Sequence, residues 1–495
     1  MSRTATQDGS PGVAMALLPT GVPGLDDILG GGLPAFSFSL IAGGPGSGKT
    51  TMAMQMLFAT STVERPGLFI TLLGETSLKL LRYQQTFDFF DVSAIGTRVH
   101  LLNLSEEALD GDLDAVLARI VHDVTALRPG MVVVDSFRSL VQSYRSDDRL
   151  SRVAGFVQRL ALHLTTWHIT SVLIGESHQL EAADPVYTVA DGILLLSQDV
   201  ERNSIVRKLQ VVKARGLRHL PGLHTLRITE EGIRAFPRAP VRLDLHLPAT
   251  SHRLSSGIPA LDAIMGGGIP VGDSLVLTGP TGSGKTTFAM QFVRAGLAAG
   301  ETAVVAIFEE RPEVYLARAD RFGPEIRDAV AADRLRVIYL RPLDLSVDET
   351  LQEIRDAVQT LSAVRVVIDS INGFEMALAP TFRADFRESL YRLIGALTRL
   401  GVTIYSTVET EALHGGTLTG YHVSFLTDII ISQRYLEMEG ALRKALLVVK
   451  MRGSDHSRAF RLYELSSSGV DVGSTLTAFD AVSGGHPMRA LRSAP

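Results

Sequence analysis

The sequence repeats itself once, and this duplication restricts the possible folds more than any other feature. The stretch TGVPGLDDILGGGLP at 20–34 returns as SGIPALDAIMGGGIP at 256–270. Solenoid repeats have periods of about 20 to 50 residues, whereas this separation has the length of a globular domain. The 495 residues are therefore predicted to form two homologous domains in tandem. Landmarks further along keep nearly the same separation, namely Lys49 with Lys285, Asp135 with Asp369, and Lys213 with Lys450.

The proline-containing stretch FPRAPVRLDLHLPATSH at 236–252 is the predicted linker between the two halves. We place the first domain at 17–245 and the second at 246–480. A flexible N-terminal segment at 1–16 is expected before them, and a short C-terminal tail at 481–495 after them.

Within each half, short apolar runs rich in β-branched residues alternate with amphipathic stretches of helical periodicity. This alternation predicts an α/β fold, with a mainly parallel sheet covered by helices on both faces, and each half is expected to end in a C-terminal β-hairpin. The strands predicted for the first half are 38–42, 68–71, 99–102, 131–134, 171–174 and 192–196. Those predicted for the second half are 274–278, 303–308, 336–340, 364–368, 403–406 and 428–432.

Both halves contain a phosphate-binding loop between a predicted strand and a predicted helix. GGPGSGKT at 43–50 and GPTGSGKT at 279–286 fit the G-x-x-x-x-G-K-[ST] pattern. Glycines let backbone N–H groups point at phosphate oxygens, and the following helix N-terminus favours negative charge. A chance glycine-rich turn is the alternative, but two matches in register argue against it. The predicted ATP-binding residues are Gly44, Gly46, Ser47, Gly48, Lys49, Thr50, Thr51 and Asp135 in the first half, and Thr281, Gly282, Ser283, Gly284, Lys285, Thr286, Thr287 and Asp369 in the second.

An aspartate ends a buried strand in each half, in MVVVDS at 131–136 and in VVIDS at 366–370. A carboxylate at this point lies near Mg²⁺ in phosphate-loop ATPases, and Mg²⁺ prefers oxygen ligands. The alternative is that each aspartate caps the next helix. The predicted Mg²⁺ ligands are Thr50 and Asp135 in the first site, and Thr286 and Asp369 in the second.

Glutamates follow the preceding predicted strand, as Glu75 in the first half and as the pair Glu309 and Glu310 in the second. A carboxylate there can orient the water that attacks the terminal phosphate, which makes these residues candidate catalytic groups. Solvated surface carboxylates are the alternative. Because the first half has Gly74 where the second has a glutamate, the two sites are expected to turn over at different rates.

Each closing hairpin carries a Lys-x-Arg-Gly motif, with Lys213 and Arg215 in the first half and Lys450 and Arg452 in the second. Alternate residues of a strand point to one face, so the two cations of a motif can act together. They suit contact with the terminal phosphate in a neighbouring subunit, as arginine fingers do. An exposed basic strand edge is the alternative.

The amino-acid composition excludes several classes of function. The 53 acidic and 48 basic side chains leave a formal charge of −5, so no global positive field favours nucleic acid or an anionic membrane. Cysteine is absent, which excludes disulfides, thiolate nucleophiles and cysteine-ligated zinc. No run approaches the roughly 18 to 20 apolar residues of a membrane span. We expect a soluble, cytoplasmic protein.

Together these motifs resemble the KaiC family of RecA-like proteins, from about Thr20 to Ala481. The segment before the loop and the Lys-x-Arg-Gly hairpin carry the resemblance, because phosphate loops occur in all RecA-like proteins. The resemblance implies two tandem RecA-like P-loop NTPase domains in a ring-shaped hexamer, with ATP between subunits. It also implies an ATPase in the first domain and a serine/threonine autokinase in the second, which act as a clock-like timer or signalling switch.

The resemblance also implies a phosphorylation site in TGYHVSFLTD at 419–428. Ser424 occupies the serine position of the family's phosphorylated pair, whereas Phe425 occupies the threonine position, so at most one principal site is expected. Thr419 matches a neighbouring threonine, and Glu309 with Glu310 matches the base that would deprotonate Ser424. A plain serine before a strand is the alternative.

Partners are less well defined by the sequence. The chain after Ala481 is shorter than in the clock proteins, which argues against a KaiA-like partner. The stretch 101–119 matches the KaiB-binding region poorly and leaves a KaiB-like partner open.

A RecA-like DNA-dependent ATPase is a competing function, since six cations lie between Arg202 and Arg218, but no aromatic residue accompanies them to stack on bases. A non-catalytic scaffold gated by ATP is the third alternative.

Overall fold

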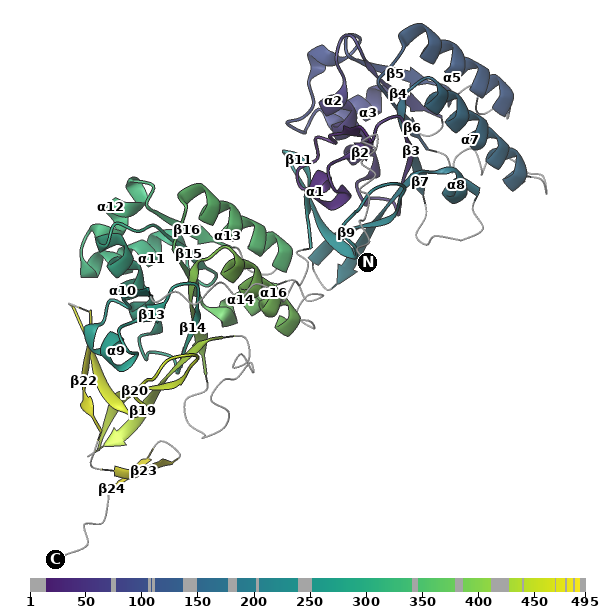
Figure 1. Cartoon of the computed structure of the whole chain (residues 1–495). Helices are drawn as coiled ribbons and strands as arrows, with labels where there is room; N and C mark the ends of the chain where they lie inside the picture. The colour runs from purple at the N-terminus through teal and green to yellow at the C-terminus, as the bar shows by residue number, and fades with distance from the viewer. Residues whose placement is uncertain are drawn as a thin grey trace, which may run out of the picture. The chain divides into compact units, whose positions relative to one another are not determined.

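The structure is a computed structural model, and it divides into two compact units between Arg238 and Ala239. Each unit has its own nine-stranded sheet and its own helices (Figure 1). The predicted boundary between 245 and 246 falls outside the described residues and stays a prediction. The described residues are 15–72, 77–105, 108, 112–136, 149–176, 185–201, 204–238, 252–340, 346–378, 386–410, 427–438, 440–467, 469–476, 479–483 and 486–489.

The sheet of the first unit has the strand order β11-β10-β9-β8-β3-β7-β6-β4-β5. Strands β3 to β8 run parallel, and β10 pairs antiparallel with both β9 and β11. The bounds are β3 Phe38–Gly43, β4 Gly67–Thr71, β5 Val99–Asn103, β6 Met131–Asp135, β7 Thr170–Glu176, β8 Gly192–Glu201, β9 Ser204–Ala214, β10 Leu223–Thr229 and β11 Gly232–Phe236.

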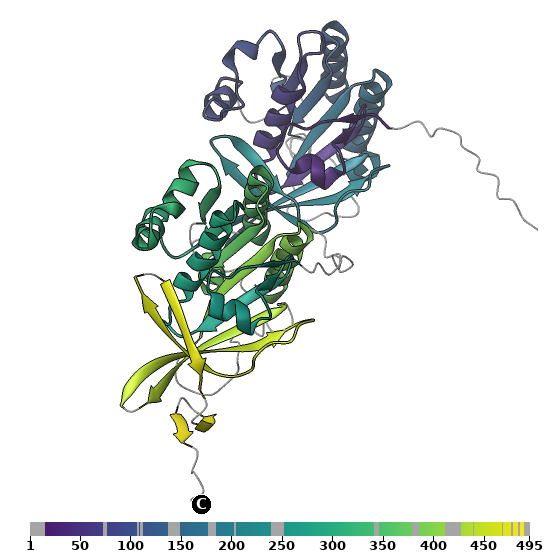
Figure 2. The same cartoon turned by 60° about the vertical axis from the view of Figure 1, so that its left-hand side comes forward.

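Helices cover both faces of this sheet (Figure 2). Leu40 of β3 belongs to a core with Val116 and Phe156, whereas the next residue, Ile41, belongs to a core with Met52. Successive side chains of a strand point to opposite faces, so α5 and α7 lie on one face and α2 on the other. The helices are α1 Leu25–Leu29, α2 Lys49–Thr60, α3 Ser77–Gln84, the 3₁₀ turn η1 Val92–Ala94, α5 Leu113–Leu127, α7 Arg149–Thr166 and α8 Pro185–Val189.

The second unit repeats this architecture, with the order β16-β15-β17-β18-β14-β19-β20-β21-β22. Its strands are β14 Ser274–Gly279, β15 Ala303–Ile307, β16 Leu335–Tyr339, β17 Arg365–Asp369, β18 Thr403–Glu409, β19 Ile429–Met438, β20 Ala441–Met451, β21 Arg461–Ser466 and β22 Gly469–Thr475. Its helices are α9 Pro259–Ile264, α10 Lys285–Ala298, α11 Pro312–Ala319, η2 Asp320–Phe322, α12 Glu325–Ala331, α13 Val347–Leu361, α14 Ile371–Ala377 and α16 Phe386–Arg399.

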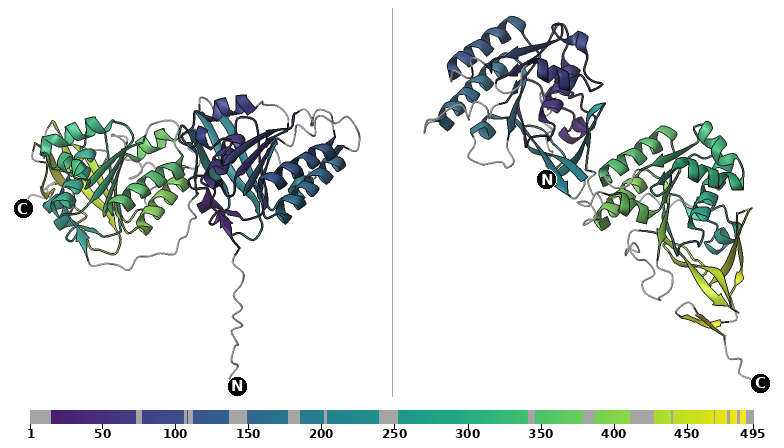
Figure 3. Two further views of the ribbon diagram at one scale, coloured as in Figure 1. Left: turned by 90° about the horizontal axis from the view of Figure 1, so that it is seen from above. Right: turned by 180° about the vertical axis from the view of Figure 1, so that it is seen from behind.

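The fold predicted from the sequence is confirmed, since every predicted strand is present and each sheet is mainly parallel with helices on both faces (Figure 3). The closing part of each unit is larger than the predicted hairpin. In the second unit β19 and β20 form the hairpin, and β21 and β22 extend it. A further small hairpin, β23 Phe479–Ser483 with β24 His486–Arg489, lies where only a tail was expected.

The repeated segment before each loop forms a short two-stranded ribbon. In the first unit β1 Leu17–Leu18 pairs with β2 Leu33–Pro34, and in the second β12 Arg253–Leu254 pairs with β13 Ile269–Pro270. The shared aspartates explain the repeated pattern, because each accepts a backbone N–H that fixes the turn before the helix. Asp26 accepts that of Thr20 at 3.0 Å, and Asp262 that of Ser256 at 2.8 Å.

Across the described ranges, no helix combines the length and the apolar character needed to cross a bilayer.

Candidate functional site

The glycines of both phosphate loops take backbone angles that other residues avoid. Gly46 and Gly48 have φ of 74° and 100°, and Gly282 and Gly284 have 75° and 100°. This left-handed region is sterically unfavourable for any residue with a Cβ. A Cβ on Gly284 would also lie 2.6 Å from Leu465 Cδ1. Both loops therefore require glycine here, and they lead directly into α2 and α10.

The lysine of each loop is held by backbone carbonyls of the loop itself. Lys49 Nζ donates to the carbonyl of Gly44 at 2.8 Å. Lys285 Nζ donates to the carbonyls of Gly279 and Pro280, both at 3.0 Å. Burial lowers the pKa of both ammonium groups, and nearby carboxylates oppose that effect. Phosphate oxygens are charged acceptors and therefore stronger partners for these lysines than the carbonyls.

The serines and threonines around each lysine lie where the motif predicts. Ser47 and Ser283 are buried inside the loops, and the Ser47 hydroxyl donates to the Gly44 carbonyl at 2.8 Å. Thr51 and Thr287 lie in the first turns of α2 and α10, one residue after the threonines predicted to bind Mg²⁺.

A threonine–aspartate pair lies beside each lysine. The Thr50 hydroxyl donates to Asp135 Oδ2 at 2.9 Å, and Thr286 makes the corresponding hydrogen bond to Asp369. Burial raises the pKa of Asp369, and hydrogen bonds from Thr407 and Thr286 oppose this shift. In each unit the structure thus brings the two predicted Mg²⁺ ligands into contact.

This donor set fits Mg²⁺. A hydroxyl and a carboxylate are hard oxygen ligands, and Mg²⁺ takes its other ligands from substrate phosphates and water. The described ranges hold no group of three or more His, Cys, Asp or Glu able to bind a metal ion by themselves. The predicted sites do not need such a group, because they share the ion with phosphate.

The two adjacent glutamates of the second unit have different partners. Glu309 is exposed and accepts the hydroxyl of Ser370, the residue after Asp369. Glu310 is ion-paired with Arg318 of α11 at 2.6 Å. Burial raises the pKa of Glu310, and the Arg318 guanidinium opposes that shift. Glu309 is therefore the carboxylate that remains available to a substrate.

Several residues singled out from the sequence lie outside the described residues, among them Gly74, Arg202 and Phe425 and three with proposed roles. The three with proposed roles are Glu75, the candidate catalytic glutamate of the first unit, and Ser424 and Thr419 of the proposed phosphorylation segment. Their roles stay predictions.

The cations of the first Lys-x-Arg-Gly motif lie at the sheet edge opposite the phosphate loop of their own unit. Arg215 pairs with Asp191 at 3.2 Å, and Asp191 also accepts the backbone N–H of Phe38, where β3 begins. The loop follows the other end of β3, roughly 17 Å away, since the six residues of the strand span five steps of about 3.3 Å. Lys213 donates to the carbonyl of Tyr187 at 3.0 Å, in α8.

The second motif repeats this placement. Arg452 pairs with Asp428 at 3.4 Å, and Lys450 donates to the carbonyl of Thr427 at 2.6 Å. Both partners precede β19, at the edge where β14 also begins. Neither unit brings its own motif cations to its own loop.

Several residues at the loops were missed by the sequence analysis. Glu176 and Glu409 end β7 and β18 beside the first glycine of each loop, and Arg318 holds Glu310. Arg207 of β9 donates to the Gly46 carbonyl at 3.3 Å. The glutamates could have been found, because they follow predicted strands at corresponding positions of the two halves. The arginines carry no such signal.

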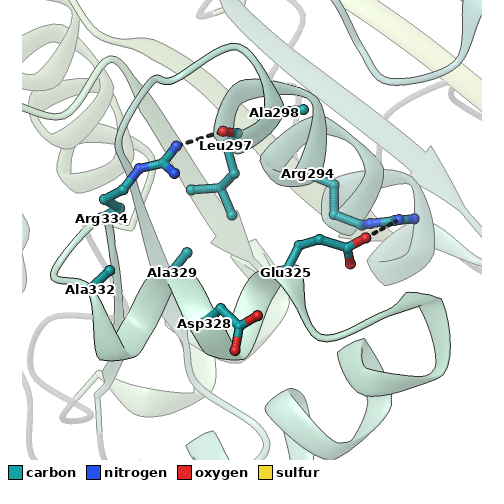
Figure 4. Close-up of a pocket in the computed structure, with 8 residues that line it drawn as sticks. All are labelled: Arg294, Leu297, Ala298, Glu325, Asp328, Ala329, Ala332 and Arg334. Atoms are coloured by element: carbon teal, nitrogen blue, oxygen red, sulfur yellow. Dashed lines mark hydrogen bonds and ion pairs between the residues drawn. The ribbon is translucent and has the colours of Figure 1, made fainter.

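The second unit also contains a hollow of about 390 Å³ between α10 and α12 (Figure 4). Three of its four charged side chains, Arg294, Glu325 and Arg334, already have partners. Arg294 pairs with Glu325 at 3.5 Å, and Arg334 donates to the carbonyl of Leu297 at 2.5 Å. It contains none of the predicted site residues, and we assign it no part in the site.

Comparison with known proteins agrees with this geometry. The family model for the KaiC ATPase matches residues 18–239 and again 254–477. The chain belongs to the KaiC family. The circadian clock oscillator protein KaiC of Parathermosynechococcus lividus is 28% identical over 95% of this chain and 88% of its own length. That of Synechococcus elongatus is 28% identical over 98% and 94%, and that of Prochlorococcus marinus 27% identical over 98% of each. This KaiC-family ATPase therefore has two tandem domains, and family membership implies nucleotide binding.

Proposed function

We propose that this KaiC-family protein binds ATP with Mg²⁺ at both loops and hydrolyses it slowly in a ring-shaped hexamer. The observation that carries the proposal is the repeated site geometry. Each unit has a glycine-bent loop, a lysine held inside it and a threonine–aspartate pair beside it. Two sites built alike support two nucleotides per chain.

In this proposal the loop residues bind the phosphates. Backbone N–H groups of each loop donate to phosphate oxygens, and Lys49 and Lys285 exchange their carbonyl partners for oxygens of the β- and γ-phosphates. Thr50 with Asp135, and Thr286 with Asp369, hold the metal ion. When bound, Mg²⁺ neutralises negative charge on the transferring phosphoryl group.

We assign proton transfer in the second site to Glu309. Its carboxylate is exposed, is oriented by the Ser370 hydroxyl, and acts electrostatically on Lys285. It would accept the proton of the attacking water in hydrolysis, or of a serine hydroxyl in phosphotransfer. Glu310, held by Arg318, completes the carboxylate pair, and Glu75 takes the corresponding part in the first site.

We also propose that the motif cations complete the site of a neighbouring subunit. Lys213 and Arg215 lie at the edge opposite their own loop, as do Lys450 and Arg452. Contact with a γ-phosphate therefore requires a loop other than that of the same unit, and we propose that a second chain supplies it. Cations supplied in this way stabilise charge in the transition state and are worth about 10³ or more in rate in other phosphate-loop enzymes.

A mixing experiment tests this arrangement. One chain carries Lys49→Ala with Lys285→Ala, and the other carries Arg215→Ala with Arg452→Ala. Each is expected to lose ATPase activity alone. After subunit exchange at equal amounts, intact loops meet intact cations at about one quarter of random interfaces, so about a quarter of wild-type activity should return.

The control for this experiment mixes the loop variant with itself, which should restore nothing. If the mixed sample recovers no activity although native mass spectrometry shows mixed rings, the cations do not act between subunits.

We further propose that the second domain phosphorylates Ser424 and that this modification serves a timer or switch. The family resemblance of 419–428 and the available Glu309 support it. Intact-mass measurement after incubation with ATP should show one added phosphate, and Ser424→Ala should remove it. Thr427→Ala, in the same segment, is the matched control and should keep the phosphate. An unchanged wild-type mass would count against autophosphorylation.

A further inference from the structure

The carboxylate of Glu409 lies beside the second phosphate loop. Glu409 ends β18 and pairs in register with Gly279, the first residue of the loop. The Thr281 hydroxyl donates to Glu409 Oε1, and Glu409 Oε2 lies 4.0 Å from Lys285 Nζ. The lysine that would bind phosphate therefore already faces a negative charge.

The backbone of Glu409 is held by hydrogen bonds, whereas its side chain is free to rotate away from the loop. The Asn372 side chain, in the first turn of α14, accepts the Glu409 N–H at 2.7 Å and donates to its carbonyl at 3.3 Å. The next residue, Thr410, donates its N–H to the Gly279 carbonyl at 3.1 Å. The Glu409 side chain is 49% exposed. Its carboxylate can thus rotate into solvent without disturbing the strand.

The first unit provides an internal comparison. Glu176 ends β7 and pairs in register with Gly43, as Glu409 does with Gly279. The residue corresponding to Thr281, however, is Pro45, which has no hydroxyl to donate. Glu176 acts electrostatically on Lys49, but the loop residue that holds Glu409 in place is missing from the first loop.

We propose that Thr281 and Glu409 form a carboxylate latch that makes the second site discriminate against the γ-phosphate. This inference rests on the proposed nucleotide binding at both loops. The loop lysine contacts the β- and γ-phosphates, so a carboxylate beside it repels a triphosphate more strongly than a diphosphate. The latch lowers the affinity for ATP more than that for ADP, and it does so at the second site alone.

The test measures nucleotide affinity at the second site by calorimetry, in the full chain with Lys49→Ala. The probes are ADP and a non-hydrolysable ATP analogue, each with Mg²⁺. Glu409→Gln is expected to raise the affinity for the ATP analogue about tenfold and that for ADP less than about threefold. Thr281→Val should change both affinities in the same directions, since it removes the hydroxyl that holds the carboxylate over the loop.

The first site, measured with Lys285→Ala, is the matched control. Glu176→Gln there should change the preference between the two probes less than about threefold, and Pro45→Thr should weaken binding of the ATP analogue. An unchanged preference in Glu409→Gln, weaker binding of the ATP analogue, or equal effects at both sites would overturn the latch alone. Failure of both parent chains to bind either nucleotide would overturn the proposed function, and the latch with it.

Discussion

At the scale of single residues, two adjacent glutamates of the second site differ in role because they have different hydrogen-bond and ion-pair partners. Glu309 and Glu310 are adjacent, yet one accepts a serine hydroxyl and the other an arginine. Burial raises the pKa of Glu310, while the cation of Arg318 favours its charged form. The charge state of this second carboxylate therefore depends on a side chain eight positions further along the chain.

Arg318→Ala should raise the pKa of Glu310, because the opposing cation is lost while burial remains. If turnover requires the ionised form, the acidic limb of the pH–rate profile should move to higher pH, so that activity falls at the acidic end of the range and changes little at the alkaline end. The measurement is ATPase activity from pH 5 to 8 in the Lys49→Ala chain, where the second site acts alone.

The matched control is Arg321→Ala, which removes an exposed arginine from the adjoining turn η2. It should leave the profile in place. An unshifted acidic limb in Arg318→Ala would show that Glu310 need not be ionised for turnover.

The sequence predicts the residues of the site only where a local pattern carries them. Lysine, threonine and glycine of the loops follow from eight consecutive letters, and Asp369 from the end of an apolar run. Glu409 meets Thr281 across 128 positions, and this contact depends on which strand lies beside β14. No local pattern specifies that neighbour. The sequence can therefore identify Glu409 as a glutamate after a strand, repeated as Glu176 in the first half, but not as a partner of the loop.

At the scale of elements, the edge where β14 and β19 begin carries a compact group of charges. Asp428 accepts the Ser274 N–H and hydroxyl at 3.0 and 2.9 Å and pairs with Arg452. Burial and the neighbouring Asp428 raise the pKa of Asp273 to about 6. Asp273, a carboxyl group with a raised pKa, thus lies near Arg452, one of the cations predicted to act on a neighbouring subunit.

Asp273→Asn should stabilise the second unit near pH 7.5, and only about a third as much near pH 4.5. The folded pKa of Asp273, about 6, exceeds the value of about 3.9 in an unfolded chain. Its destabilising contribution therefore grows as the pH rises between these values and is fully present above 6. The expected gain at pH 7.5 is about 2 to 3 kcal/mol.

Tryptophan fluorescence would report on the first unit, because the single tryptophan, Trp167, lies there. The stability of the second unit is therefore measured by pulsed proteolysis in urea, with peptides from β14 as the readout. Asp471→Asn, on the exposed side of β22, is the control and should stay within about 0.5 kcal/mol. A gain of equal size at both pH values would show that ionisation of Asp273 is not the cause.

At the scale of the whole molecule, the duplication seen in the sequence extends to the strand order of the two sheets. The number of units and their class were predictable, because a 3.6-residue and a two-residue periodicity alternate in both halves. The antiparallel strands β10, β11, β21 and β22 were not predicted, since their residues lack long apolar runs. The small terminal hairpin was missed for the same reason.

Lys49→Ala and Lys285→Ala should reduce turnover unequally. Removal of a loop lysine should inactivate its own site, on the order of 100-fold. If the second loop disfavours triphosphate, Lys49→Ala removes most of the activity at limiting ATP, and the two losses approach each other at saturation. Steady-state rates over a wide ATP range provide the measurement. Equal losses at every concentration would exclude a division of labour between the loops.

The difference between Pro45 and Thr281 corresponds to a single base change in a codon. Proline codons begin CC and threonine codons begin AC, with the third base unrestricted in both. A single base change can therefore convert one kind of loop into the other, in either direction. After the duplication, the two copies could separate into an open and a guarded nucleotide site by one point mutation, with both sheets left as they were.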